Sequence, residues 1–272
     1  MKRGVVIVAL LFAGLCPANS RADVQRSNLP PRIDPALSIL PANHLKFYLH
    51  FFRPMERGAV FQHLRLVEID ASGKEVAVVP EPFREVELWD ETFTRMTMWF
   101  HPGRQKPGVN LNVEIGPILE EGKRYRLELS RNWRDEDGRP MDWLLRHEFL
   151  TGPPDETQPD PAKWTIATEG GLVRVTTDGP LDPESLRKRV MVRPAGEGVE
   201  LAVTVEADAG GFTMRRAGGW PAGAYRLIVD PRLEDLAGNS VARPFNVDLE
   251  KGAVKEGETV EVGFVVRRTN DE

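Results

Sequence analysis

Residues 122–138 read GKRYRLELSRNWRDEDG, and residues 223–239 read GAYRLIVDPRLEDLAGN. In both stretches a glycine precedes a tyrosine, an alternating run follows, and an Asp and a Gly stand 10 and 13 residues after the tyrosine. A matching start recurs as FRPME at residues 52–56 and DGPLD at residues 178–182. Two copies of one structural module explain this pattern, because internal repeats mark repeated units of fold.

The segments around these motifs alternate between apolar and polar residues, which is typical of half-buried β-strands. The clearest case is LKFYLHF at residues 45–51. Comparable runs lie at residues 64–66, 85–89, 96–100, 125–129, 173–175, 190–192, 201–206 and 225–229, and only residues 183–188 suggest a helix. Many short strands with frequent turn residues predict an all-β fold of two sandwiches rather than an α/β fold.

Composition divides the chain into segments. Residues 23–36 are predicted to be an extended, proline-containing lead, and residues 153–162, with four prolines and no large apolar side chain, form the clearest linker. The sandwiches are therefore expected at residues 37–152 and 163–249. Residues 250–272 are charged but alternate again at 260–266, so they are expected either to add a late strand or to stay loose.

The N-terminus has the pattern of a signal peptide over residues 1–22. Lys2 and Arg3 precede an apolar run, and Ser20-Arg21-Ala22 offers small residues at the positions that a signal peptidase reads. We therefore expect an exported protein, placed in the periplasm, on the cell surface or in the medium. Cys16 is the single cysteine, and Leu15 before it argues against a lipoprotein site.

Charge limits the class of partner. The full chain has a net charge of -5, and removal of three basic residues with the signal gives -5 - 3 = -8. A nucleic-acid partner is not expected, because such proteins carry a basic footprint. No segment after the signal is long and apolar enough to predict a transmembrane helix.

These motifs resemble the bacterial Ig-like domains of the surface-layer (SbsA) type. The resemblance rests on Pro54-Met55-Glu56 and Pro180-Leu181-Asp182 at the openings, and on residues 125–138 and 225–239 at the closings. The second copy keeps Asp-Leu-Ala-Gly-Asn at 235–239, whereas the first has Arg139 in place of the Asn. The resemblance covers residues 37–249. It implies two tandem immunoglobulin-like β-sandwiches with a spacer or adhesive role and no common catalytic residue.

The two copies differ most in length between the strand near Thr97 and the closing glycine. The first copy has about 15 more residues, approximately 103–117, which we interpret as a hairpin insertion. Loops on a rigid scaffold often carry binding residues. Candidate ligand-binding groups for an anionic or sugar ligand are therefore Asp90, His101, Arg104 and Lys106, while the alternative is a hairpin with solvated charges.

The repeated turn offers a candidate calcium site. Asp135, Asp137, Asp235 and Asn239 provide oxygen ligands of the kind that calcium prefers. Their spacing differs from an EF-hand loop, and the alternative is turn chemistry, in which Asp bonds its own backbone and Gly takes positive φ.

Six tryptophans allow a sugar-stacking interpretation. Trp89 and Trp220 stand beside predicted turns and are the candidates for exposure, whereas Trp99 is expected in the core.

Motifs for catalysis are lacking. The sequence has no HExxH zinc motif, no GxSxG elbow and no glycine-rich phosphate loop. We therefore expect a non-enzymatic, cofactor-free structural or binding module, with an envelope protein or glycan as its partner. The alternative is a carbohydrate-binding module that uses Trp89, Trp220 and the Arg104 loop. A hydrolase with dispersed carboxylates is the third possibility.

Overall fold

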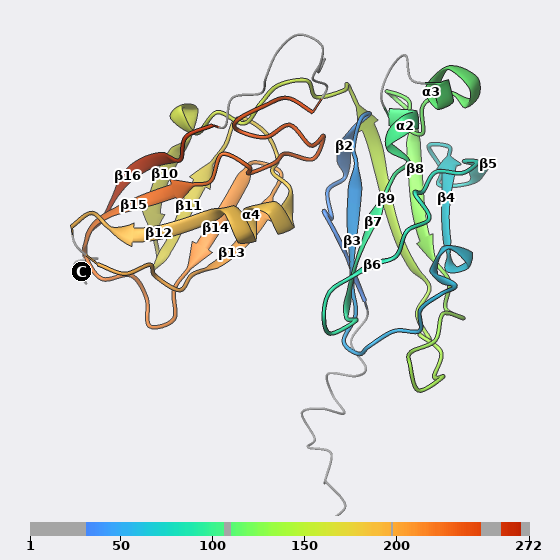
Figure 1. Ribbon diagram of the computed structural model, residues 1–272, viewed down its shortest axis with the longest axis horizontal. Coiled ribbons are helices and arrows are strands. Elements are labelled where there is room, and N and C mark those ends of the chain that lie inside the picture. The colour runs from blue at the N-terminus through green and yellow to red at the C-terminus, as the bar shows by residue number, and fades with distance from the viewer. Residues whose placement is uncertain (1–30, 106–109, 197, 246–256, 268–272) are drawn as a thin grey trace, which may run out of the picture.

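The computed structural model of the protein describes residues 31–105, 110–196, 198–245 and 257–267. Strands dominate and the helices are short, so the predicted all-β fold is confirmed. Figure 1 shows two groups of strands that follow one another along the chain. We call residues 31–152 the first half and residues 153–267 the second half. Every sheet lies within one half.

The first half contains two sheets, and all pairings in them are antiparallel except β2 with β9. One sheet has the order β1 (Arg32–Asp34), β3 (Lys46–His50), β7 (Arg95–Trp99) and β6 (Leu88–Trp89). The other has the order β2 (Ile39–Pro41), β9 (Leu145–Gly152), β8 (Arg124–Leu129), β4 (Leu64–Ile69) and β5 (Glu75–Val78). A 3-10 turn, η1 (Val60–His63), leads into β4.

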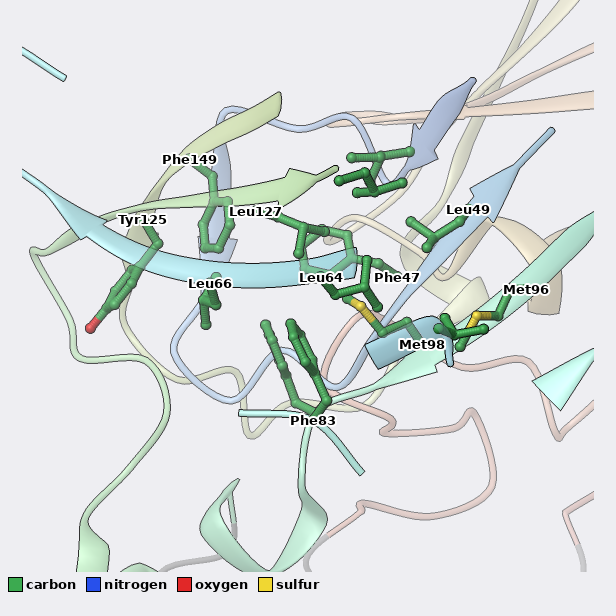
Figure 2. Close-up of a cluster of buried hydrophobic side chains, with 14 of the residues drawn as sticks. Phe47, Leu49, Leu64, Leu66, Phe83, Met96, Met98, Tyr125, Leu127 and Phe149 are labelled. Atoms are coloured by element: carbon green, nitrogen blue, oxygen red, sulfur yellow. The ribbon is translucent and has the colours of Figure 1, made fainter. Parts of the chain in front are cut away.

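The core of the first half lies between these two sheets (Figure 2). Alternate residues of β3 and β7 point inward from one sheet and meet residues of β4, β8 and β9 from the other. Among the labelled members are Phe47, Leu49, Met96 and Met98 on one side and Leu64, Leu66, Tyr125, Leu127 and Phe149 on the other. This two-layer packing is the physical reason for the period-two pattern.

In the residues that the structure describes, the predicted insertion is helical rather than a hairpin. Its described parts are α2 (Pro102–Gln105) and α3 (Asn110–Ile115). Gly116 follows α3 with a φ of 85°, a left-handed conformation that commonly ends a helix. The hairpin interpretation was wrong because a length difference between two copies reveals an insertion but not its local structure.

The second half also contains two sheets. The first has the order β10 (Thr165–Glu169), β11 (Leu172–Thr176), β14 (Gly211–Arg215) and β13 (Thr204–Asp208). The second has the order β12 (Val190–Pro194), β15 (Gly223–Val229) and β16 (Val260–Val266). The short elements are η2 (Pro161–Lys163) and α4 (Pro183–Arg189), the latter where the sequence suggested a helix. β16 pairs with β15, so the tail does add a late strand.

The repeated motif forms the same turn in both halves. Asp135 Oδ1 accepts hydrogen bonds from the amides of residues 137 and 139, and Asp235 Oδ1 accepts them from the amides of residues 237 and 239. Gly138 and Gly238 have φ angles of 81° and 84°. The repeated starts join these turns through bridges of Met55 with Asp135 and of Leu181 with Asp235. The repeat therefore extends from sequence to backbone geometry.

The predicted linker at 153–162, which begins the second half, is hydrogen-bonded to residues of both halves. Asn43 of the first half and Asn239 of the second half both donate to the carbonyl of Asp155. The predicted signal peptide, Cys16 and the first part of the lead lie outside the described residues. None of the helices in the described part of the chain has the length and apolar character needed to cross a bilayer. The assignment of the two halves to the Ig-like type stays a prediction.

Candidate binding groove

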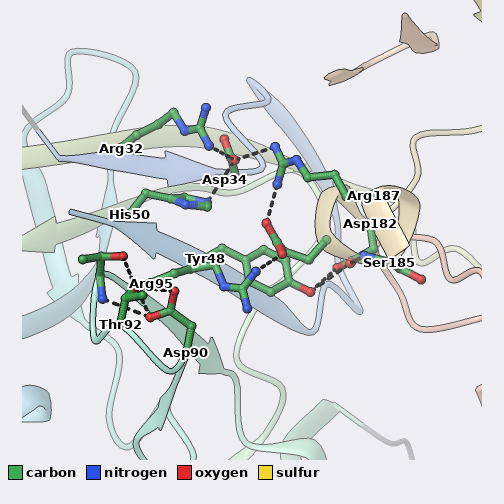
Figure 3. A network of polar contacts seen from close by, with 12 residues as sticks. Arg32, Asp34, Tyr48, His50, Asp90, Thr92, Arg95, Asp182, Ser185 and Arg187 are labelled. Atoms are coloured by element: carbon green, nitrogen blue, oxygen red, sulfur yellow. Dashed lines mark hydrogen bonds and ion pairs between the residues drawn. The ribbon is translucent and has the colours of Figure 1, made fainter. Parts of the chain in front are cut away.

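β3 is covered on both of its faces. Phe47 and Leu49 belong to the core of the first half, while Lys46 contacts Asp182 on the other face. Tyr48 and His50 also point to that face (Figure 3). Lys46 and Tyr48 are nevertheless buried, because α4 and the loop after β15 lie over this face. The outer face of the β1-β3-β7-β6 sheet is thus the surface on which the second half is seated.

Asp182 is the central group of this contact. It begins α4 as the N-cap, its Oδ1 accepts the amide of Ser185 at 2.7 Å, and Pro183 occupies the first helical position. The same carboxylate accepts the hydroxyl of Tyr48 at 2.8 Å and lies 3.5 Å from Lys46 Nζ. Burial raises the pKa of Asp182, although Lys46, the Ser185 amide and Tyr48 oppose this effect.

Lys46 bridges two carboxylates of the second half. Its Nζ lies 2.7 Å from Glu234 Oε2 in addition to its contact with Asp182. Burial lowers the pKa of Lys46, but the two carboxylates outweigh that effect and the pKa lies above its ordinary value. Lys46 is therefore held as a cation in the contact.

A second chain of charges runs beside the first (Figure 3). Glu184 of α4 pairs with both Arg95 of β7 and Arg187 of α4. Arg187 also reaches Asp34 of β1 at 3.4 Å, and Asp34 lies 3.2 Å from His50 Nε2. Burial raises the pKa of Asp34, but His50, Arg32 and Arg187 together hold that pKa below its ordinary value.

A groove of about 650 Å³ opens where this contact ends. We call it the central groove. One wall comes from β3, β6 and β7, and the other from α4 and the loops after β15. Its lining residues are Lys46, Tyr48, Leu88, Arg95, Thr97 and Trp99 from the first half, with Asp182, Glu184, Ser185, Lys188, Arg189, Arg232, Glu234, Gly238, Ser240, Arg243, Pro244 and Phe245 from the second.

Basic side chains dominate the second-half wall of the groove. Lys188, Arg189, Arg232 and Arg243 are the four cations there. Arg189 and Arg232 share the carboxylate of Asp230, at 3.2 Å and 2.7 Å. The hydrogen bond from Arg232 is the main cause that lowers the pKa of Asp230 to about 2, so this carboxylate is ionised at neutral pH. We call the four cations the cationic rim.

The first-half wall offers an aromatic surface. Trp99 is partly exposed in the groove, and Lys46 Nζ lies 5.1 Å from its ring centroid. Leu88 is also exposed beside it. Trp99 is expected in the core, but it lies on the outer face of β7. It shares the outward register of Arg95 and Thr97, whereas Met96 and Met98 point into the core.

The ligand-binding candidates from the sequence are not brought together. Trp89 packs against Phe51 and Trp133, and its Nε1 donates to Glu87. Asp90 closes the β6–β7 turn by accepting the amides of residues 94 and 95. His101 lies beyond the opposite end of β7, where its Nδ1 accepts the amide of residue 103.

Arg104 has a structural role instead of the predicted ligand-binding one. It is 2% exposed, and its guanidinium donates to the carbonyls of Gly116 at 3.0 Å and Pro117 at 2.9 Å and also to that of Pro80. The side chain therefore ties both ends of the insertion to the loop after β5. Lys106 lies outside the described residues.

Trp220 lies in the second half, on the loop between β14 and β15. Its ring packs edge-on against Tyr225 and Phe264, and it remains partly exposed. It lines a small pocket of about 260 Å³ together with the β10–β11 turn at Gly170 and Gly171.

The calcium candidates make turn contacts in both halves. Asp135 is paired with Arg53 at 2.8 Å and Arg139 at 3.0 Å, and Asp137 is paired with Arg139. Asp235 Oδ2 instead accepts the Asn239 amide at 2.9 Å. Among the described residues, no group of three or more His, Cys, Asp or Glu side chains is placed to hold a metal ion. The turn chemistry accounts for these residues, and calcium binding stays a prediction.

No protein-family model and no curated protein matches this chain. The resemblance to the surface-layer type therefore rests on the repeated motifs alone.

Sequence reasoning did not single out the cationic rim. Lys188 and Arg189 stand in the predicted helix, while Arg232 and Arg243 flank the repeated Asp-x-x-Gly turn. Each pair has an ordinary local interpretation, because cations favour the last turn of a helix and polar residues favour turns. The cluster would have been found only with information that α4 lies beside the loop after β15, and the sequence contains no such information.

Proposed function

We propose that this protein is a non-enzymatic binding module of the bacterial envelope, and that the central groove takes its ligand. One observation carries this proposal. The central groove has walls held in place by buried contacts, and its lining contains more cations than carboxylates. Buried contacts of Lys46 and Tyr48 with Asp182 hold the walls. Preorganised walls favour binding, because little ordering entropy is lost when a ligand enters.

The remainder of the protein suits such a role. Two sandwiches with an all-β core present loops at their ends, and rigid scaffolds commonly carry recognition residues on loops. The export signal expected at residues 1–22 and the resemblance to surface-layer modules both support an envelope location. The partner is either an envelope protein or a glycan.

The test is capture from an envelope extract with the mature chain, a groove variant and a matched control. The groove variant is Lys188→Glu with Arg243→Glu, and the control is Arg193→Glu with Arg215→Glu. All four side chains are exposed, and the control residues lie outside the groove. A partner held by the parent and control chains but lost by the groove variant supports the proposal. A partner held equally by all three contradicts it, and no partner at all favours a spacer role.

Carbohydrate binding at Trp220 is the second candidate. It is favoured by the partly exposed indole beside the β10–β11 turn, in a pocket that Thr168 and Glu169 also line. Sugars stack on aromatic faces, and hydroxyl or carboxylate groups nearby bind their hydroxyls. A glycan array with the parent chain and Trp220→Phe tests it. A neutral glycan bound by the parent and lost in the variant supports this candidate, and an array without binders contradicts it.

A further inference from the structure

We infer that the ligand of the central groove is a compact molecule with two or more phosphate or carboxylate groups. This inference rests on the proposed function, because it assigns a ligand class to the same groove. Its basis is the arrangement of charge in the groove rather than the total charge of the chain, which is -5.

The first step is the balance of charge. The groove is lined by six cations (Lys46, Arg95, Lys188, Arg189, Arg232 and Arg243) and by three carboxylates (Asp182, Glu184 and Glu234). The three carboxylates are already engaged, by Lys46, Tyr48, Arg95 and Arg187. The charge of these carboxylates is therefore neutralised within the contact, and they do not neutralise Lys188 or Arg243.

The second step concerns the cationic rim itself. Arg189 and Arg232 are both engaged by Asp230, so the charges open to a ligand are those of Lys188 and Arg243. Lys188 and Arg243 are exposed and form no ion pair with any residue that the structure describes. The helix dipole accounts for a cation at Lys188, near the end of α4, but not for Arg243, which lies on a loop.

Gathering like charges on one rim is unfavourable until a counter-charge arrives. Arginine and lysine donors bind phosphate and carboxylate oxygens through charge-assisted hydrogen bonds, which are stronger than neutral ones. A ligand with at least two acidic groups can neutralise Lys188 and Arg243 together. The partly exposed Trp99 ring on the opposite wall then offers a surface for the ligand body.

The third step is size. A volume of about 650 Å³ lies within the range of small-molecule sites, about 300–1,000 Å³. The groove therefore suits a short acidic oligosaccharide or another small oligoanion rather than a nucleic-acid duplex, whose binding the net charge of -5 disfavours.

The experiment is isothermal titration calorimetry of the full mature chain with three probes. Sodium tripolyphosphate tests phosphate groups, trigalacturonic acid tests carboxylates on a sugar, and neutral maltotriose controls for the sugar alone. The groove variant is Lys188→Gln with Arg243→Gln, and the matched control is Arg193→Gln with Arg215→Gln. Both remove two positive charges from exposed side chains, and thermal melting verifies that each variant is folded.

We expect one of the two anions to bind with 1:1 stoichiometry. Its affinity should fall about tenfold or more in the groove variant, stay unchanged in the control and weaken with added salt. Binding of tripolyphosphate alone assigns a phosphate ligand, and binding of trigalacturonate alone assigns a carboxylate ligand.

Three results would overturn the inference. They are no binding of either anion, an equal loss of affinity in both variants, or binding of maltotriose as tight as that of the anions. The envelope capture separates this failure from that of the proposed function. A partner lost only with the charge-reversed groove variant keeps the groove as a binding site even if neither small anion binds.

Discussion

The hydroxyl of Tyr48 on β3 donates to the carboxylate of Asp182 at the start of α4, with an oxygen–oxygen distance of 2.8 Å. The two residues are 134 positions apart in the chain, and both are buried. Because Asp182 also caps α4, one carboxylate fixes the helix and seats it on the first half. This contact sets the position of the wall that carries the cationic rim.

Removing the Tyr48 hydroxyl should weaken the whole contact. Tyr48→Phe leaves a buried carboxylate without one of its donors, and we expect a loss of about 1.5–3 kcal/mol in the free energy of unfolding. Urea denaturation measures it. Tyr225→Phe is the matched control, because its hydroxyl donates to the neutral carbonyl of Pro221 and should cost about 0.5–1.5 kcal/mol. Equal losses in the two variants would contradict the role given to Asp182.

Lys46→Met should be more severe and depend on pH. The substitution leaves Asp182 without its cation, and breaking a buried pair costs about 3–5 kcal/mol. Loss of Lys46 raises the folded-state pKa of Asp182 further, so the deficit should be largest at neutral pH and shrink as the pH falls toward the ordinary carboxyl range. Denaturation at several pH values measures this trend.

The control for Lys46→Met is Lys163→Met. Lys163 forms an exposed pair with Asp160, and such pairs contribute about 0–1 kcal/mol. A deficit for Lys46→Met that is as small as that of the control, or that does not change with pH, would argue against a buried charged contact.

Buried His44 should make the protein sensitive to acid. Burial, helped by the charges of His147 and Lys46, lowers the pKa of His44 from 6.5 to about 3. A folded-state pKa below the unfolded one means that stability is present above about pH 6.5 and is lost as the pH falls toward 3, by up to about 1.4 kcal/mol per pH unit. His44→Leu should flatten this slope in acid denaturation experiments. An unchanged slope would assign the acid sensitivity to other groups.

Asp235 should make the protein less stable as the pH rises, which is the opposite of the effect of His44. Burial and the nearby Asp155 raise the pKa of Asp235 from 3.8 to about 7, although hydrogen bonds from Asn239 and Ala237 oppose this effect. Stability from this group is therefore present below about pH 4 and lost as the pH rises through 7. Asp235→Asn should remove this dependence, so its stability relative to the parent chain should improve between pH 5 and pH 7.5.

Asp135→Asn provides the comparison at the equivalent turn. Asp135 has Arg53 and Arg139 as counter-ions, so we expect this substitution to cost more stability at neutral pH than Asp235→Asn does. The free energy of unfolding of each variant, measured at pH 5 and at pH 7.5, provides the comparison. If Asp235→Asn cost more stability than Asp135→Asn, the replacement of Asn by Arg139 in the first copy would not explain the charge of its turn.

Arg104 should matter for stability and not for ligand capture. Arg104→Met leaves the carbonyls of Gly116, Pro117 and Pro80 without their donor, and we expect a loss of about 3 kcal/mol or more. Arg146→Met should cost far less, because Arg146 is itself exposed and its partner Glu128 keeps Arg65 and Arg126 as counter-ions. If Arg104→Met kept its stability but no longer captured the ligand, the binding role predicted from the sequence would be supported instead.

The sequence by itself determined the all-β class, the repeat and most strand positions. These are local properties, since alternation follows from the pleat and the Asp-x-x-Gly turn bonds its own backbone. The sequence did not determine the structure of the insertion. The sequence pattern predicts Arg104 as a loop cation, yet its burial depends on carbonyls of residues 80, 116 and 117, which only the fold brings together.

Only the tertiary structure decided which polar faces are covered. Tyr48 and Trp99 occupy the outer register of their strands, a position that usually faces water. Tyr48 is buried because the second half is seated on it, and Trp99 lines the groove beside that seat. Such contacts join residues more than a hundred positions apart through a few charges, and a single sequence carries no periodic signal for them. The groove and its cationic rim therefore belong to the packing of the two halves.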